Sequence, residues 1–219
     1  MEWSWFPVQL SIIVALTATM MTLIIGIITA YWIVTKSIKG KAIIETILFL
    51  PLVLPPTVIG FLLIVVFGKN SPPGQWIEWL TGRSLLFTST AAIIAATIVA
   101  FPLMYQSVKT GFLSVDHQII SAAKVDGASG WKLLTVIILP LSIRAIITGM
   151  ILSFTRAFGE FGATLMFAGN IPGSTQTIPA AIYLALETGE TQIAWYYALI
   201  SIGFSFILLF SINRTKRYS

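Results

Sequence analysis

Four long stretches without a charged side chain constrain the fold of this chain more than any other feature. They cover residues 3–35, 46–68, 84–108 and 191–213, and each is 23 residues or longer. A helix rises about 1.5 Å per residue and needs about 20 residues to cross the hydrocarbon core of a membrane. Each stretch is therefore long enough for one membrane-spanning helix.

A fifth apolar stretch, at about residues 143–166, contains Arg156 and Glu160. Of the 219 residues, 57% are hydrophobic and 10% are charged, whereas soluble domains carry about 25% charged residues. We predict an all-α, polytopic membrane protein with five spans in a single transmembrane domain. The predicted spans lie at about residues 9–35, 44–67, 85–108, 143–166 and 193–213.

The lysines and arginines fall unevenly on the two sides that five spans would create. Ten of the 13 lie on one side: Lys36, Lys39, Lys41, Lys109, Lys124, Lys132, Arg144, Arg214, Lys216 and Arg217. Only Lys69 and Arg83 lie on the other side. Because cytoplasmic loops carry the excess of positive charge, we predict an external N-terminus and a cytoplasmic C-terminus. The basic balance follows from this topology, so it indicates a lipid environment and no nucleic-acid partner.

Several kinds of site are excluded by the residues that the sequence lacks. It has no cysteine and one histidine, which rules out disulfides and leaves almost no ligands for a transition metal. It has no G-x-x-x-x-G-K-[ST] phosphate loop, so it does not bind ATP in that manner. His117 lies outside the spans, so none of them pairs a nucleophile with a histidine base. We predict no catalytic residue and no enzymatic activity.

Prolines within the predicted spans indicate where helices should kink or unwind. The second span contains Pro51, Pro55 and Pro56, and the third contains Pro102. Proline removes a backbone donor and clashes with the preceding turn. Freed carbonyls are tolerated in a membrane where they face a neighbouring helix or a water-filled cavity. Pro55 and Pro56 are candidates for a transport pathway, although a structural kink would use the same residues.

Arg156 and Glu160 are the costly residues of the fourth span. Their spacing of four places them on one helical face, where they can pair. An arginine near the bilayer centre costs about 2.5–3.5 kcal/mol on insertion scales, and such groups generally face a bundle interior or a cavity. Gly159 and Gly162 would permit a close approach of helices beside the pair. We predict a pathway or gate at these residues, with a structural ion pair as the alternative.

A polar segment, residues 109–142, separates the third and fourth spans and is predicted to be cytoplasmic. It is compatible with a short helix that glycines at 127 and 130 break or bend, and Trp131 offers a large anchor. Small residues on a compact helix are typical of a docking surface. An amphipathic helix lying on the membrane would show a similar pattern.

Ala122, Ala123 and Gly127, followed by the Leu139–Pro140 pair, resemble the cytoplasmic coupling motif of bacterial ATP-binding-cassette (ABC) importer permeases. That motif is written E-A-A, three residues, G, then I-x-L-P. Ser121 stands where the motif has glutamate. The resemblance implies that this coupling segment seats in a groove of a separate ATPase. The coupling residues it implies are Ser121, Ala122, Ala123, Asp126, Gly127, Gly130, Leu139 and Pro140.

Residues 156–183, from the Arg156 and Glu160 pair through Asn170 and Pro172 to Tyr183, resemble the molybdate permease branch of that family. The resemblance implies a type I ABC importer permease core in a bacterial cytoplasmic membrane. It implies a pathway for molybdate or tungstate through a homodimer, with cytoplasmic ABC ATPases and an external molybdate-binding protein. This chain would bind no cofactor, and ATP and Mg would be used by the ATPase.

Three other functions remain open at this stage. Sulfate and thiosulfate permeases are similar around the arginine and glutamate but diverge after Gly162. A secondary anion transporter working alone would need coupling carboxylates within its spans, where only Glu160 is available beside a cation. A membrane scaffold without transport would use the coupling segment to bind a soluble partner.

Overall fold

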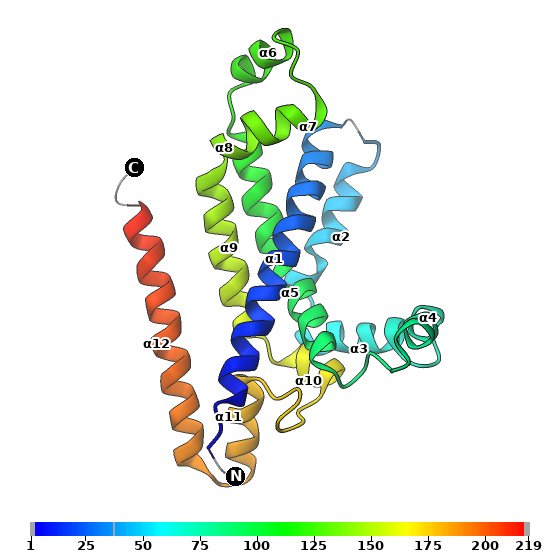
Figure 1. Cartoon of the computed structure of the whole chain (residues 1–219), viewed down its shortest axis with the longest axis vertical. Coiled ribbons are helices and arrows are strands. Elements are labelled where there is room, and N and C mark those ends of the chain that lie inside the picture. Colours follow the sequence, from blue (N-terminus) through cyan, green and yellow to red (C-terminus); the bar gives the residue numbers. More distant parts are fainter. Residues whose placement is uncertain (1–2, 37, 217–219) are drawn as a thin grey trace.

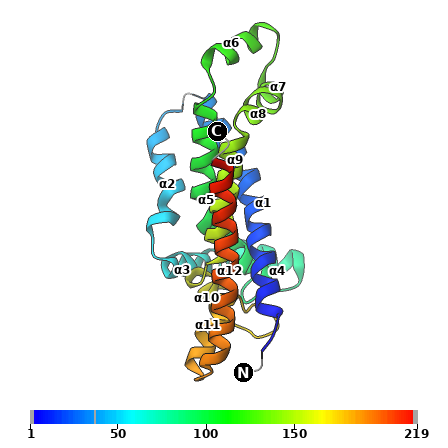
Figure 2. The same cartoon turned by 90° about the vertical axis from the view of Figure 1, so that its left-hand side faces the viewer.

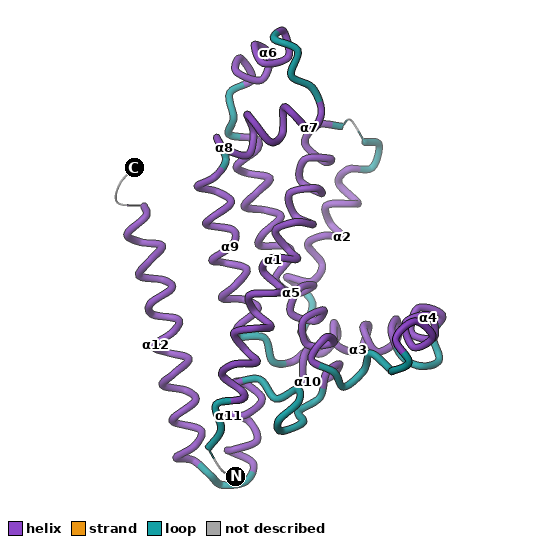
Figure 3. Tube along the Cα trace, viewed as in Figure 1, coloured by secondary structure: helices purple, strands orange, loops and turns teal. Residues whose placement is uncertain are grey.

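A computed structural model describes residues 3–36 and 38–216, which form helices joined by turns and loops with no strand among them (Figures 1 and 3). Three helices in this part of the chain are long and apolar enough to cross a membrane, α1 (Phe6–Thr35), α5 (Ser89–Leu113) and α12 (Thr191–Lys216). The predicted all-α fold class is confirmed.

Shorter helices complete the described part of the chain. They are α2 (Lys41–Val53), α3 (Pro56–Phe67), α4 (Pro72–Thr81), α6 (His117–Val125), α7 (Gly130–Leu133), the π-helical turn η1 (Leu134–Ile138), α8 (Leu139–Leu141), α9 (Ile143–Phe158), α10 (Gly162–Ala168) and α11 (Ile178–Glu187). Two bent pairs, α2 with α3 and α7–α8 with α9, also have the length and composition of a span. Counting each pair once gives up to five spans in the described residues.

Helix α5 is the centre of the bundle, because its most extensive contacts are with α1 and α9, which also contact each other. Its first half presents small side chains to both neighbours. Five of its alanines are completely buried, namely Ala91, Ala92, Ala95, Ala96 and Ala100. Lipid tails are as apolar as leucine, so helices in a membrane associate through close packing that small residues permit.

The predicted second span, residues 44–67, is broken rather than straight. Helices α2 and α3 meet at an angle of 115°. The break falls at Leu54–Pro55, whose ψ angles of 141° and 136° are extended, and Pro56 occupies the first turn of α3. Proline is tolerated there because that N–H has no intrahelical acceptor. Helices α2 and α5 continue through Pro51 and Pro102. Of these four prolines, only Pro55 and Pro56 lie where a helix is interrupted.

The predicted fourth span, residues 143–166, is also divided. Helix α9 bends by 77° from α7–α8 near Ser142 and ends at Phe158. Residues 159–161 are not helical, and α10 begins a new helix at Gly162. The single helix expected here is therefore two helices with a break between them. Helix α11, which is ten residues long, was not predicted from the sequence.

The coupling segment begins later than residue 109. Helix α5 continues to Leu113, so Lys109 lies on a spanning helix and not in the polar segment. The reason is that the buried face of α5 continues, since Val108 is completely buried and Phe112 is 3% exposed. The helix therefore keeps packing past the first charged side chain.

Chain connections gather at the two ends of the bundle in the grouping that the charge count requires. The α1–α2 connection, α6 and the last turn of α12 lie toward one end, and the described N-terminal residues lie at the other (Figures 1 and 2). The α3–α4 and α10–α11 regions lie toward the N-terminal end. Which end is cytoplasmic stays a prediction, and the charged residues Glu2 and Arg217 lie outside the described residues.

Candidate functional site

Helix α6, which contains the first half of the predicted coupling motif, projects beyond the ends of the long helices (Figure 1). It begins where the Asp116 carboxylate accepts a hydrogen bond of 2.7 Å from the Gln118 N–H, which is a typical N-terminal cap. None of its residues is buried. Ser121 and Ala122 are exposed and Ala123 is half-buried. The motif residues are therefore presented to the surroundings on a short capped helix.

Two glycines at positive φ shape the turn after α6, as the sequence predicts. Gly127 has φ of 83° and Gly130 has φ of 51°, a region that side chains with a Cβ rarely adopt. The Ala128 N–H donates to the Ala123 carbonyl at 2.9 Å, which closes the helix in the manner of a Schellman motif. Asp126 is exposed at the helix end. The chain thereby reverses within a few residues and enters α7.

One hydrogen bond from α1 holds this turn. The Tyr31 hydroxyl donates to the Gly130 carbonyl at 2.9 Å, across 99 positions of sequence. The next residue, Trp131, keeps 68% of its surface exposed, as expected for an anchor that meets something outside this chain. The coupling segment is thus fastened to the spanning helix α1, while the Trp131 side chain stays mostly exposed.

The second half of the motif leads back to the bundle through a π-helical turn. In η1 the Leu139 N–H donates to the Leu134 carbonyl, five positions earlier. Pro140 follows directly, and its ring would clash with the carbonyl four positions before it in a regular α-helix. A π-turn is one way to accommodate the extra bulk. Leu139 is half-buried, and Pro140 is exposed.

The predicted pair of Arg156 and Glu160 forms, but across a helix end. Nη1 of Arg156 lies 2.7 Å from Oε2 of Glu160, whose side chain is only 1% exposed. Oε1 of Glu160 accepts a hydrogen bond of 2.9 Å from the Ala163 N–H, in the first turn of α10. Because α9 ends at Phe158, the pair does not lie along one continuous helix. It is instead a clasp, Arg156–Glu160, that joins the end of α9 to the start of α10.

The clasp lies beside a close contact between α10 and α3. A Cβ added at Gly162 would be 2.9 Å from the Pro56 Cβ, and one added at Gly60 would be 2.6 Å from the Met166 Cβ. The break at Pro55 and Pro56 therefore lies beside Gly162. A shared role in a pathway would require this proximity. Gly159 behaves differently, because a Cβ there would meet only the Thr155 carbonyl of its own helix at 3.6 Å. The expected close approach is found at Gly162 and not at Gly159.

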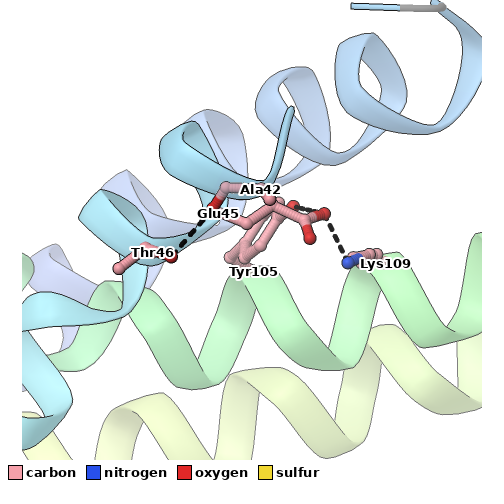
Figure 4. A network of polar contacts seen from close by, with 5 residues as sticks. All are labelled: Ala42, Glu45, Thr46, Tyr105 and Lys109. Carbon is pink, nitrogen blue, oxygen red and sulfur yellow. Dashed lines mark hydrogen bonds and ion pairs between the residues drawn. The ribbon is translucent and has the colours of Figure 1, made fainter. Parts of the chain in front are cut away.

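A second ion pair, between Glu45 and Lys109, was not predicted from the sequence. In the structure they form an ion pair, and the Tyr105 hydroxyl donates to the same Glu45 oxygen at 3.1 Å (Figure 4). We call Glu45, Tyr105 and Lys109 the α2–α5 cluster. The signal that could have found it is that Glu45 and Lys109 each border a long charge-free run, with opposite charges.

One known protein family matches most of the chain. The family model described as binding-protein-dependent transport system inner membrane component matches residues 10–216. The chain belongs to this family. As a member of this transport family it is a multi-pass protein of the bacterial inner membrane, which agrees with its several long apolar helices.

Individual relatives in the transport family are similar over nearly their whole length. YvgM of Bacillus subtilis, which is named as a molybdenum transport system permease protein, is 52% identical over 212 residues, covering 97% of this chain and 93% of that protein. The molybdenum transport system permease protein ModB of Escherichia coli K12 is 39% identical over 207 residues, covering 94% of this chain and 90% of ModB. The relatives are themselves permease proteins of transport systems.

A solved structure confirms the fold independently. A chain of a bacterial alginate ABC transporter, crystallised with an alginate-bound periplasmic protein, superposes with a TM-score of 0.72 at 17% identity, covering 97% of this chain and 79% of that one. At this identity the likeness shows the fold alone. The fold is that of a type I ABC transporter permease, as the sequence resemblance implies.

Proposed function

We propose that this chain is the permease subunit of an ATP-driven importer and forms the transmembrane pathway for molybdate, with tungstate as a second substrate. The observation that supports this most directly is the 52% identity to a molybdenum transport permease over 97% of the chain. The exposed α6, with its motif residues and Gly127 turn, supports a subunit that receives movement from another protein.

The proposed partners follow from the two ends of the molecule. Two cytoplasmic ABC ATPases, which use ATP and Mg, would receive α6 in a groove, so this chain itself would bind no cofactor. An external molybdate-binding protein would deliver the oxyanion to the end that carries α4 and the α10–α11 loop. Two copies of this chain would form the pathway between them as a homodimer. Charge counting supports this arrangement, because the end predicted to be external carries few basic side chains that could attract an anion unaided.

In this proposal the clasp and the Gly162–Pro56 contact guard the pathway. The Arg156 side chain is 30% exposed while that of Glu160 is 1% exposed, so part of the arginine side chain stays accessible beside the ion pair. Buried carboxylates in a membrane are retained where a partner compensates their charge. A pathway role would use the exposed side of Arg156, whereas a purely structural role would use only its bond to Glu160.

The proposed function is tested with a complex purified through a tag on this chain, together with its ATPase and binding protein. ATP hydrolysis is measured in lipid nanodiscs with the binding protein loaded with molybdate, tungstate or sulfate. We expect molybdate and tungstate to stimulate hydrolysis and sulfate to leave it at the basal rate. Equal stimulation by sulfate would assign the chain to the sulfate permeases instead. Anion flux through proteoliposomes that lack the ATPase would identify a secondary transporter. Absence of flux both with and without the ATPase would favour a membrane scaffold that does not transport.

A further inference from the structure

Helix α2 packs loosely against the bundle. None of its residues is buried. Both of its ends are interrupted, by Gly40 with φ of 78° before it and by the 115° bend at Leu54–Pro55 after it. Its main helix partner is α5, and Figure 2 shows it along the side of the bundle. Such a helix can tilt as a rod unless a specific contact holds it.

The α2–α5 cluster supplies that contact. Tyr105 and Lys109 are four positions apart on α5 and present their polar ends on the same face. Oε1 of Glu45 accepts from both, from the Tyr105 hydroxyl at 3.1 Å and from the Lys109 ammonium in a very short contact (Figure 4). The ammonium also lies 5.9 Å from the centre of the Tyr105 ring. One oxygen of α2 is therefore bound by two groups of α5.

The ion pair in this cluster is partly shielded from solvent. The Glu45 side chain is 22% exposed and that of Lys109 is 18% exposed. A fully exposed pair is weak and screened by salt, whereas a shielded pair that breaks leaves charges without compensation. Breaking this pair therefore costs free energy, which favours the arrangement in which α2 is held on α5.

The same cluster is continuous with the coupling segment. Lys109 lies one turn before the end of α5, and Asp116, the cap of α6, follows three residues after that helix ends. Tyr105 belongs to the apolar cluster that also contains Leu133, Leu134 and Ile138 from the returning half of the coupling segment. Phe49 of α2 packs against it too, edge-on to the Tyr105 ring at 5.7 Å.

We propose that Glu45, Tyr105 and Lys109 are positioning residues that make α2 follow α5, so that movement of the coupling segment reaches the bend at Leu54–Pro55. That bend places Pro56 against Gly162 at the clasp, and α2 is the rod between the two regions. The proposal rests on the proposed function, because the ATPase proposed there is what moves the coupling segment. The fastening of α2 to α5 depends on this chain alone.

The test compares four variants in the purified complex. Lys109→Met removes the charge and keeps the length of the side chain, and Glu45→Gln removes the opposite charge. The double variant Glu45→Lys with Lys109→Glu reverses the pair and leaves the number of cationic side chains at this end unchanged. Thr46→Val is the matched control, because Thr46 is exposed and its hydroxyl donates only to Ala42 of its own helix (Figure 4).

Hydrogen exchange of the amides in residues 41–53 is measured without nucleotide and after trapping with ATP and vanadate. We expect Lys109→Met and Glu45→Gln to accelerate this exchange about fivefold or more, as local opening becomes easier. The nucleotide-dependent difference in α2 should be lost, and substrate-stimulated hydrolysis should fall by a similar factor. The reversed pair should restore both, and Thr46→Val should change neither.

Unchanged exchange of α2 in Lys109→Met, or failure of the reversed pair to restore it, would overturn the fastening. Faster exchange with normal uptake per ATP would overturn the link to the coupling segment, because the cluster would then only brace α2. If no oxyanion stimulates the unmodified complex, the proposed function fails. The exchange experiment without nucleotide would still decide whether the cluster fastens α2.

Discussion

The coupling segment and the clasp are both joints between helices, but their polar groups are satisfied in opposite ways. In α6 the side chains are exposed, including Val125 at 87% and Ile119 at 45%, and the helix is held by its own caps. In the clasp Glu160 is almost completely buried, and each of its oxygens accepts a hydrogen bond from this chain. The first joint leaves its side chains open to the surroundings, and the polar groups of the second are satisfied within this chain.

This difference indicates how each region should respond to substitution. A helix with no buried residue adds little to the stability of the chain, so changes there should alter transport and leave assembly intact. A buried ion pair at a helix end should affect both transport and assembly. Removing one member leaves the other as an unpaired charge in an apolar environment. The predictions below test that separation, beginning with the largest effect.

Replacing Gly127 should have the largest effect on transport. Gly127→Val should reduce uptake to background, because a β-branched residue at φ of 83° would force the chain out of the turn after α6. A Cβ here meets nothing within 4 Å, so the strain is in the backbone and not in packing. Uptake of labelled molybdate by cells and the amount of complex in the membrane are measured together.

Gly127→Asn is the matched control for this substitution, since asparagine tolerates the left-handed region better than other side chains. It should keep a substantial part of the uptake. Normal transport by Gly127→Val in a normally assembled complex would remove the coupling assignment of this turn.

Arg156→Ala should have the next largest effect, and on assembly as well as on transport. It leaves the buried Glu160 carboxylate with only the Ala163 N–H, a loss of up to about 3 kcal/mol for a broken buried pair. Glu160→Ala should be milder, because the Arg156 side chain that it leaves unpaired is already 30% exposed. The amount of assembled complex and its midpoint of thermal unfolding are measured beside uptake.

The double variant Arg156→Ala with Glu160→Ala separates the two roles of the clasp. Recovery of assembly without recovery of uptake would support a pathway role for the arginine. Recovery of both would make the clasp a structural ion pair. Normal transport by each single variant would remove the gate proposal altogether.

Gly162→Ala should produce a moderate loss of stability. The added methyl would lie 2.9 Å from the Pro56 Cβ and 3.4 Å from the Thr57 nitrogen, so α3 and α10 must separate. Overpacking of this kind costs about 1–3 kcal/mol. Gly203→Ala in α12 is the control, because an added Cβ there meets nothing within 4 Å. Equal thermal midpoints for the two variants would show that the α3–α10 contact is not tight.

The sequence predicts what depends on composition and local chemistry, and it misses what depends on which helices become neighbours. Charge-free runs predict the long spans, and glycines predict the turn after α6. Pro55 and Pro56 predict a break but not its angle of 115°. Glu45 and Lys109 are 64 positions apart, and Gly162 and Pro56 are likewise distant. Their contacts arise only when α2 packs on α5 and α3 packs on α10. The end of α9 at Phe158 was missed because an apolar run does not show where a helix stops.

Tyr31→Phe should have the smallest effect and tests whether the coupling segment is as independent of the bundle as its exposure indicates. The change removes only the hydrogen bond to the Gly130 carbonyl, which is worth about 0.5–1.5 kcal/mol. Because this is the long-range hydrogen bond from α1 to the turn, its loss should lower molybdate transported per ATP hydrolysed while basal hydrolysis and thermal stability stay unchanged. Tyr196→Phe is the control, since that hydroxyl accepts from Gln192 within α12, far from the turn in sequence. A fall in thermal stability without a change in coupling would show that Tyr31 belongs with the clasp, as a joint that holds the chain together, and not with the surface that receives another protein.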